Sequence, residues 1–146
     1  MNTYEIINQV LVHLFNEIWK LEENAIITEE FKDISNNDMH IIEAITENGN
    51  NMSTIAKKLN ITVGSLTTSM NSLVNKKYVT RERSETDRRV VNIQLTPKGL
   101  SAFRHHAQFH KEMTDAVVKK LNEKELSVLE KTLEGLSDFF HNYHKK

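Results

Sequence analysis

The sequence predicts a mainly α-helical fold with a small β-wing, and three observations support this. Apolar residues recur at helical spacing over long stretches near both ends of the chain. Gly and Pro number only 4 and 1, so little interrupts these helices. Two short β-type runs, at 79–84 and 90–95, flank a polar tip. At 146 residues, we expect one domain, or one domain extended by helices.

The first elements follow from local patterns. Residues 3–21 place apolar pairs at helical spacing and predict an amphipathic helix. Residues 22–36 are polar and acidic and predict a helix end and a loop. Asn36 or Asn37 is expected to cap a second helix, which should end near the turn at 48–50.

A pair of short helices should follow. Ser53 is expected to cap a helix over 54–59, residues 60–61 form the turn, and Thr62 caps the next helix over 63–76. Two short helices joined by so short a turn predict a helix-turn-helix. The two β-type runs that come next predict a hairpin, whose tip is the polar stretch 85–89.

The C-terminal third is predicted to be helical. Thr96 and Pro97 are cap and first residue of a helix that runs to about Leu121, and Asn122 caps a last helix. These helices and the first one carry apolar stripes that the small central domain cannot cover alone. Packing of two chains would cover them, whereas an intramolecular bundle is the alternative.

Composition narrows the class of protein. The chain has no Cys, which fits the cytoplasm, and its first residues do not resemble a signal peptide. No apolar run is long enough to span a membrane. The formal net charge of −1 hides an asymmetry, because 22–47 hold eight acids and one Lys while 76–98 hold seven bases and three acids. One basic face is enough to bind a polyanion such as DNA.

The basic region predicts a DNA-reading surface. Short polar side chains gather on one face of the helix over 63–76, where they suit contacts to base edges and phosphates in the major groove. Asp87 is expected to brace Arg89 for insertion into a narrow minor groove. Arg81, Arg83, Arg88 and Lys98 are expected to contact phosphates. The predicted DNA-binding residues are Ser65, Thr67, Thr68, Asn71, Arg81, Arg83, Asp87, Arg88 and Arg89. The alternative is a solvated helix face beside an ordinary charged turn.

The stretch 87–99, Asp-Arg-Arg-Val-Val-Asn-Ile-Gln-Leu-Thr-Pro-Lys-Gly, resembles the wing and following helix start of the MarR family of repressors. The resemblance extends over essentially the whole chain and implies a winged helix-turn-helix with terminal dimerisation helices. One departure is Lys77, which stands where the family usually has Gly. Further segments resemble the fatty-acid-synthesis repressors within that family, at 31–35, 62–69, 83–91 and 109–113.

The resemblance also implies that DNA binding and dimerisation belong to different parts of the chain. Residues 37–96 would form the DNA-binding domain, and residues 1–36 together with 97–146 the helical dimerisation region. A symmetric dimer would place two recognition helices ~34 Å apart and read a palindromic operator.

The resemblance to fatty-acid-synthesis repressors implies a corepressor, long-chain acyl-acyl carrier protein, whose acyl chain enters an apolar tunnel at the dimerisation helices. The candidate tunnel residues are Leu11, Phe15, Trp19, Phe103, His106 and Phe109. The alternative is that these residues are only core. Because acyl carrier protein is acidic, Arg104 and Lys111 are candidates for its docking.

A second hypothesis is that the protein is a zinc-responsive repressor that binds no acyl ligand. His106 and His110 are four residues apart and share a helix face, a spacing that can hold Zn²⁺. With Glu22 and His40 they correspond in spacing to ligands of zinc-sensing members of the family, although the Cys of that subgroup is absent. A pH-responsive histidine cluster without metal is the simpler alternative.

An enzyme and an architectural DNA binder are two further classes of function. The sequence has no nucleophile elbow, Gly-rich phosphate loop or repeated Glu-x-x-His pair, so we expect no enzyme activity. An architectural DNA binder without a ligand would show weak sequence preference and no ligand response, whereas a repressor requires both an operator and a ligand effect.

Overall fold

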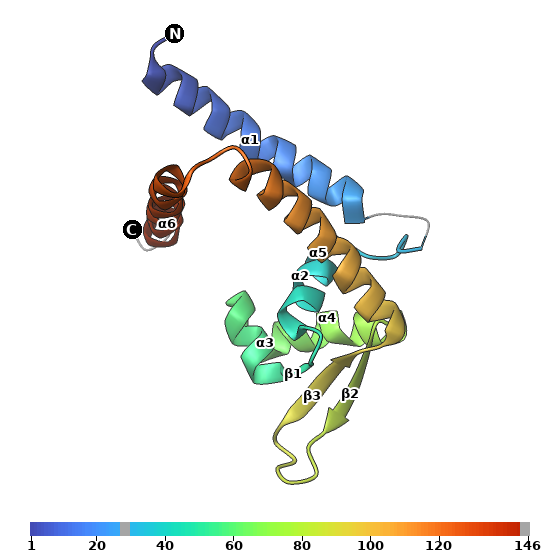
Figure 1. Ribbon diagram of the computed structural model, residues 1–146. Coiled ribbons are helices and arrows are strands. Elements are labelled where there is room, and N and C mark those ends of the chain that lie inside the picture. Colours follow the sequence, from blue (N-terminus) through green and yellow to red (C-terminus); the bar gives the residue numbers. More distant parts are fainter. Residues whose placement is uncertain (27–29, 144–146) are drawn as a thin grey trace. The chain divides into compact units, whose positions relative to one another are not determined.

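The computed structural model describes residues 1–26 and 30–143 (Figure 1). It confirms a mainly α-helical fold with a small antiparallel sheet. In chain order, the elements are α1 (Thr3–Ile26), α2 (Asn36–Ile45), β1 (Asn50–Asn51), α3 (Met52–Leu59), α4 (Val63–Asn75), β2 (Val79–Arg83), β3 (Val91–Leu95), α5 (Pro97–Val118) and α6 (Glu123–Tyr143). No helix among the described residues is long and apolar enough to cross a lipid bilayer.

The chain forms two compact units, Met1–Phe109 and His110–Lys146. This division differs from the predicted one, which separated 37–96 from both terminal regions. The start of α5 belongs to the first unit because Ala102, together with Phe31 and Ile34, is buried in the same core as the helix-turn-helix. The end of α1 contacts α5 through Glu22, whose Oε1 lies 3.3 Å from His106 Nε2. Residues 144–146 of the predicted dimerisation region lie outside the described residues.

The core of the first unit forms where α2, α3 and α4 meet the sheet. Its side chains are fully buried aliphatic residues from each of these elements, including Ile42, Ile55, Leu66, Leu73 and Ile93. Burial of each such side chain stabilises the fold by roughly 1.5–3 kcal/mol. The core therefore fixes the helix-turn-helix and the sheet as one body.

Two helix starts differ from their predicted positions. Ser35, not Asn36 or Asn37, caps α2, because its hydroxyl accepts from the Asp38 N–H and the Asp38 carboxylate accepts from the Ser35 N–H, each at 3.1 Å. This reciprocal pair satisfies two backbone groups at once. Asn51, not Ser53, caps α3, because its extended backbone lets Oδ1 accept from the Thr54 N–H at 2.8 Å.

The other predicted caps are confirmed. Thr62 caps α4 by accepting from the Ser65 N–H at 3.1 Å. Asn122 precedes α6 and exchanges hydrogen bonds with Glu125, with the Glu125 N–H donating to Asn122 Oδ1 at 2.9 Å.

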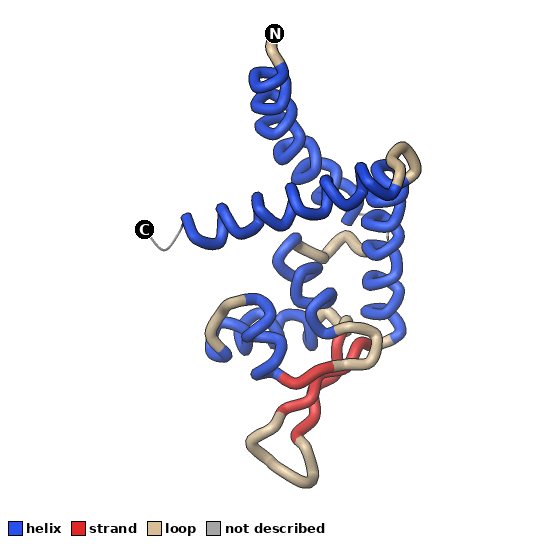
Figure 2. Tube along the Cα trace, turned by 60° about the vertical axis from the view of Figure 1, so that its left-hand side comes forward, coloured by secondary structure: helices blue, strands red, loops and turns tan. Residues whose placement is uncertain are grey.

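The sheet has the strand order β1-β3-β2, with both pairs antiparallel. The hairpin register pairs Val79 with Leu95 and Arg83 with Val91, and the two strands fall within the predicted β-type runs. Figure 2 shows the loop between β2 and β3 projecting beyond the helices of the first unit. The two-residue strand β1 was missed, because Asn50 and Asn51 are too few to show an alternating pattern.

The corner between α4 and the wing contains a left-handed lysine. Lys77 has φ 68°, and the Tyr78 N–H donates to Leu73 O while the Lys77 N–H donates to Val74 O, each at 3.0 Å. These two bonds form a Schellman cap, in which the left-handed position usually belongs to Gly. Lys77 therefore adopts a backbone conformation that is strained for a residue with a Cβ.

Apolar side chains remain exposed in both units. In the first unit, seven large apolar residues of α1 are between 43% and 57% exposed, namely Ile6, Ile7, Val10, Val12, Leu14, Phe15 and Trp19. In the second unit, α6 buries none of its described residues and exposes Val128, Leu133, Phe139, Phe140 and Tyr143. A single chain thus leaves the predicted stripes uncovered.

We predict that Lys77→Gly raises the free energy of unfolding by about 1 kcal/mol, because Gly adopts the left-handed conformation without a Cβ penalty. Urea denaturation monitored by circular dichroism measures the change. Lys77→Ala removes the same charge but keeps a Cβ, so it should bring no such gain. Equal stabilisation by both variants would assign the effect to charge.

Candidate nucleic-acid interface

Helix α4 separates an apolar face from a polar one. Leu66, Met70 and Leu73 are fully buried against the core. The predicted DNA-contacting residues Ser65, Thr67, Thr68 and Asn71 are all exposed on the other side. The helix therefore presents short hydroxyl and amide groups to the outside, which suit hydrogen bonds to base edges and phosphates.

Several of these polar groups already have partners in the protein. The Thr67 hydroxyl donates to Val63 O at 2.8 Å, which leaves its oxygen to accept from a ligand. The Ser65 Oγ receives a hydrogen bond from the Thr62 hydroxyl at 3.0 Å. The outward-facing groups are thus oriented before any ligand arrives.

The wing tip confirms the predicted brace. Both carboxylate oxygens of Asp87 accept from the Arg89 guanidinium, from Nε and Nη2, each at 3.1 Å. The Arg89 N–H also donates to Asp87 Oδ1 at 3.1 Å. The Arg89 guanidinium holds the pKa of Asp87 below its usual range. Because the Arg89 side chain is 90% exposed, it is fixed in direction yet free to contact a ligand.

The other predicted phosphate contacts have distinct environments. Arg81 Nη1 donates to Asn71 Oδ1 at 2.6 Å, and Arg83 Nη1 donates to Arg88 O at 3.0 Å. Both guanidiniums keep further N–H groups for a ligand, since arginine has five. Arg88 is exposed on the wing loop.

Lys98 is turned toward the protein instead of toward a ligand. Its Nζ lies 4.3 Å from the centroid of the Tyr78 ring and donates to Lys76 O at 3.3 Å. A cation over an aromatic face is an attractive contact. The phosphate contact of Lys98 stays a prediction.

A groove of about 600 Å³ lies between α4 and the wing. Three arginines and several hydroxyl and amide groups line it, with no acidic side chain: Asn51, Met52, Ser53, Val63, Thr67, Asn71, Arg81, Arg83, Arg89, Val90 and Val91. The arginines and the hydroxyl and amide groups of this lining suit a nucleic-acid backbone and the base edges beside it. Asn51 and Ser53 were not predicted here, because their position depends on the unpredicted strand β1.

Tyr78, which is fully buried, lies between the end of α4 and the start of β2. Its hydroxyl donates to Asp33 Oδ1 at 2.6 Å, and its ring centroid lies 6.5 Å from that of Phe31. Burial and this hydrogen bond raise the pKa of Tyr78, while the bond lowers the pKa of Asp33. Lys76 adds an ion pair to the buried Asp38 at 2.9 Å. The sequence offered no local signal for these distant contacts.

The six predicted tunnel residues fall into two groups within the first unit. On α1, Leu11 is half-buried, whereas Phe15 and Trp19 are 46% and 57% exposed. On α5, Phe103 and Phe109 are half-buried and His106 is buried. A single chain does not bury Phe15 or Trp19, and the tunnel stays a prediction.

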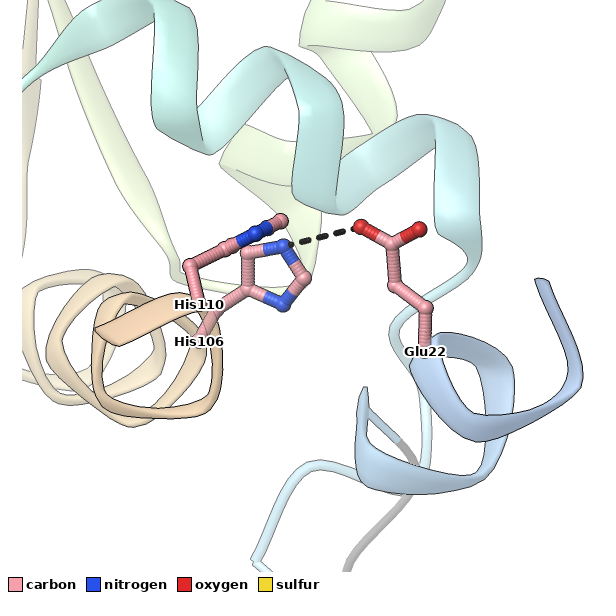
Figure 3. A group of neighbouring side chains, drawn as sticks. All are labelled: Glu22, His106 and His110. Atoms are coloured by element: carbon pink, nitrogen blue, oxygen red, sulfur yellow. Dashed lines mark ion pairs between the residues drawn. The ribbon is translucent and has the colours of Figure 1, made fainter. Parts of the chain in front are cut away.

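His106 is the centre of a polar cluster. Its Nε2 lies 2.6 Å from Glu43 Oε1 and 3.3 Å from Glu22 Oε1. Figure 3 shows Glu22 facing the His106 ring, with His110 on the same helix, α5. His40 does not join His106. It is exposed, and its Nδ1 lies 3.7 Å from Glu43 Oε2. Glu43, one turn from the predicted ligand His40, makes the close contact with His106.

Comparison with known proteins agrees with this interface. The family described as "Transcriptional regulator SarA/Rot" matches residues 25–106. The crystal structure of Streptococcus pneumoniae FabT in complex with DNA has 39% sequence identity and a TM-score of 0.83, covering 96% of this chain and 99% of that one. The adhesin competence repressor AdcR from Streptococcus pyogenes has 23% identity and a TM-score of 0.70, covering 92% and 97%.

A curated relative, the HTH-type transcriptional regulator YpoP of Bacillus subtilis (strain 168), is 28% identical over 110 residues, or 75% of this chain and 76% of that protein. The chain belongs to the MarR-type winged-helix family of DNA-binding transcriptional regulators, with the SarA/Rot regulators. Its relatives are regulators and not enzymes.

We predict that Arg89→Ala weakens DNA binding by ~1–3 kcal/mol, because it removes the charge that the wing tip presents. Fluorescence anisotropy at fixed salt measures the affinity, and circular dichroism checks that the fold is intact. Asp87→Asn keeps the Arg89 charge but removes the ionic brace, so its loss should be smaller. Unchanged affinity in Arg89→Ala would exclude the wing tip from the interface.

Proposed function

We propose that this regulator is a dimeric, sequence-specific repressor of fatty-acid-synthesis genes, with long-chain acyl-acyl carrier protein as corepressor. The similarity to FabT over nearly the whole of both chains is the observation that carries this proposal. The segments at 31–35, 62–69, 83–91 and 109–113, which resemble fatty-acid-synthesis repressors, support the same assignment. DNA binding itself follows from the family and from the cationic groove.

A dimer would account for the uncovered apolar side chains. Each large apolar residue removed from water contributes roughly 1.5–3 kcal/mol, and α1 and α6 each expose at least five. Packing of the same helices from a second copy would bury them. A two-fold axis would also place two α4 helices on one face, about 34 Å apart, which suits a palindromic operator.

The acyl chain would use the apolar residues of α1 and α5. Phe15 and Trp19 of α1 expose aromatic surface, and Phe103 and Phe109 of α5 are only half-buried. Such surfaces bind alkyl chains because each buried methylene contributes about 0.8 kcal/mol. His106 is the one buried polar group among these residues.

Docking of the acidic carrier would involve Arg104 and Lys111. Arg104 Nε lies 3.1 Å from Glu47 Oε1, and Lys111 Nζ lies 2.6 Å from Asp115 Oδ2. The Asp115 contact raises the pKa of Lys111, which keeps it charged. Both basic side chains are about two-thirds exposed, at 65% and 67%. Exposed ion pairs are weak, so an acidic partner can displace them.

A zinc-responsive repressor is the second candidate. The observation that favours it is the contact of His106 Nε2 with both Glu22 and Glu43, since imidazole and carboxylate groups are zinc ligands. His110 lies one helical turn further along α5 and would supply a second nitrogen. In this arrangement Glu43 takes the place that His40 had in the sequence-based ligand set.

One titration separates the two candidates. A labelled palindromic duplex from a fatty-acid-synthesis promoter is titrated with the protein in EDTA, with and without long-chain acyl-acyl carrier protein. Tighter binding with the acyl carrier supports the first candidate and removes any need for metal. No effect of the carrier, followed by tighter binding on addition of zinc, supports the second, and His106→Asn should then abolish the zinc response while His40→Asn should not.

We predict that saturating long-chain acyl-acyl carrier protein changes the emission of Trp19, the only tryptophan in the chain, because the ligand would cover its exposed ring. Steady-state fluorescence measures the change. The carrier protein without an acyl chain is the control and should leave the emission unaltered. Emission that ignores the acylated ligand would place the acyl chain away from Trp19.

A further inference from the structure

A wing arginine is bonded to a side chain of the recognition helix. Arg81 of β2 donates from Nη1 to Oδ1 of Asn71 on α4 at 2.6 Å. Both side chains are exposed and both line the groove between α4 and the wing. The contact thus lies on the surface that faces DNA, and no other hydrogen bond recorded among the described residues joins a β2 side chain to α4.

The chemistry of this contact fixes the direction of the Asn71 amide. Arginine carries only donors, so the amide atom that faces it must be the carbonyl oxygen. A hydrogen bond with a charged donor is roughly twice as strong as a neutral one. Oδ1 is therefore held toward β2, and Nδ2, which branches from the same carbon, is turned away from the wing with its N–H groups available.

Thr67, one helical turn before Asn71, offers a hydrogen-bond acceptor to a ligand, whereas Asn71 offers donors. Its hydroxyl proton is donated to Val63 O at 2.8 Å, so its oxygen can only accept from a ligand. The two residues stand four apart on one helix face and both line the groove. The face thus offers an acceptor at Thr67 and donors at Asn71 in a fixed order.

This arrangement changes what Asn71 can read. An asparagine that recognises adenine uses both amide atoms, because it donates to N7 and accepts from the N6 amino group. Because Arg81 holds Oδ1 toward β2, this oxygen can meet a base only through its second lone pair, whereas both N–H donors of Nδ2 point away from the wing. Guanine presents two acceptors in the major groove, N7 and O6, and no donor there. A guanine edge therefore matches the oriented amide better than an adenine edge does.

We propose that Arg81 is a specificity-determining residue of the operator complex, which turns the Asn71 amide into a donor that selects guanine over adenine. This inference rests on the proposed sequence-specific binding of an operator. Arg81 acts through Asn71 as a positioning residue, in addition to any phosphate contact made by its remaining N–H groups.

Arg83 provides a matched control on the same strand. It is two residues from Arg81, lines the same groove and carries the same charge. Its recorded side-chain hydrogen bond goes to Arg88 O in the wing, so no such bond links it to α4. Arg81→Met and Arg83→Met therefore remove equal charge, and only the first releases the Asn71 amide.

The experiment selects binding sites from a randomised duplex library with the full-length wild type, Arg81→Met and Arg83→Met. We expect the wild type and Arg83→Met to select guanine at one symmetric position in each half-site, and Arg81→Met to accept adenine there. Anisotropy on the selected duplex and its guanine-to-adenine variant then gives the discrimination. The ratio of affinities for the guanine and adenine duplexes should be at least about fivefold in the wild type. It should fall below about twofold in Arg81→Met, as expected for loss of one side chain–base contact.

Asn71→Ala completes the test as a double-mutant cycle. In the Asn71→Ala background, Arg81→Met should leave the base preference unchanged, because the amide it positions is gone. An Arg81→Met protein that selects the same sites as the wild type, with only weaker affinity, would overturn this inference while the proposed function stands. A wild type that selects no common sequence would overturn both.

Discussion

The placement of the recognition helix and the wing depends on the contacts of one buried residue, Tyr78. Its hydroxyl bonds Asp33 at 2.6 Å, its N–H closes the cap of α4 on Leu73, and its carbonyl accepts from the Thr96 N–H at 3.0 Å. One residue thus joins the segment before α2, the end of α4 and the start of α5. Gly99 is required beside it, because a Cβ there would lie 2.0 Å from the Tyr78 carbonyl oxygen. The recognition helix α4 ends just before Tyr78, and strand β2 of the wing begins just after it.

The same corner is joined to the end of α1 by continuous contacts within the first unit. The Phe31 ring lies 6.5 Å from Tyr78 and 5.9 Å from His105, measured between centroids, and His105 Nε2 lies 2.9 Å from Ala25 O. His105 is adjacent in sequence to His106, the centre of the polar cluster. A ligand at that cluster would alter DNA affinity only if it bound two arrangements of this corner with different affinity. The fold supplies the contiguous packing through which such a difference would act.

Sequence reasoning succeeded where the determining chemistry is local. The caps at Thr62 and Asn122, the two strands of the hairpin and the Asp87–Arg89 brace each depend on residues within a few positions or on a regular alternation. It missed β1, since two residues show no period, and with it the cap at Asn51. Tyr78 and Asp33 are 45 positions apart, so no local pattern reports their bond. The bond from Arg81 to Asn71 depends on how a strand leaves a helix, which residue types alone do not specify.

The wing arginines show why this position in the fold favours arginine over lysine. Arg81, Arg83 and Arg89 each donate to a protein acceptor, yet each keeps further N–H groups, because the guanidinium has five in a planar fork. A lysine ammonium is a point charge on a flexible stem and could not hold an amide or a carboxylate with comparable direction. Such exposed contacts add little to folding stability. The contribution of these arginines lies in binding, because ordering a free side chain costs about 0.5–1.5 kcal/mol and side chains already held in place avoid most of that cost.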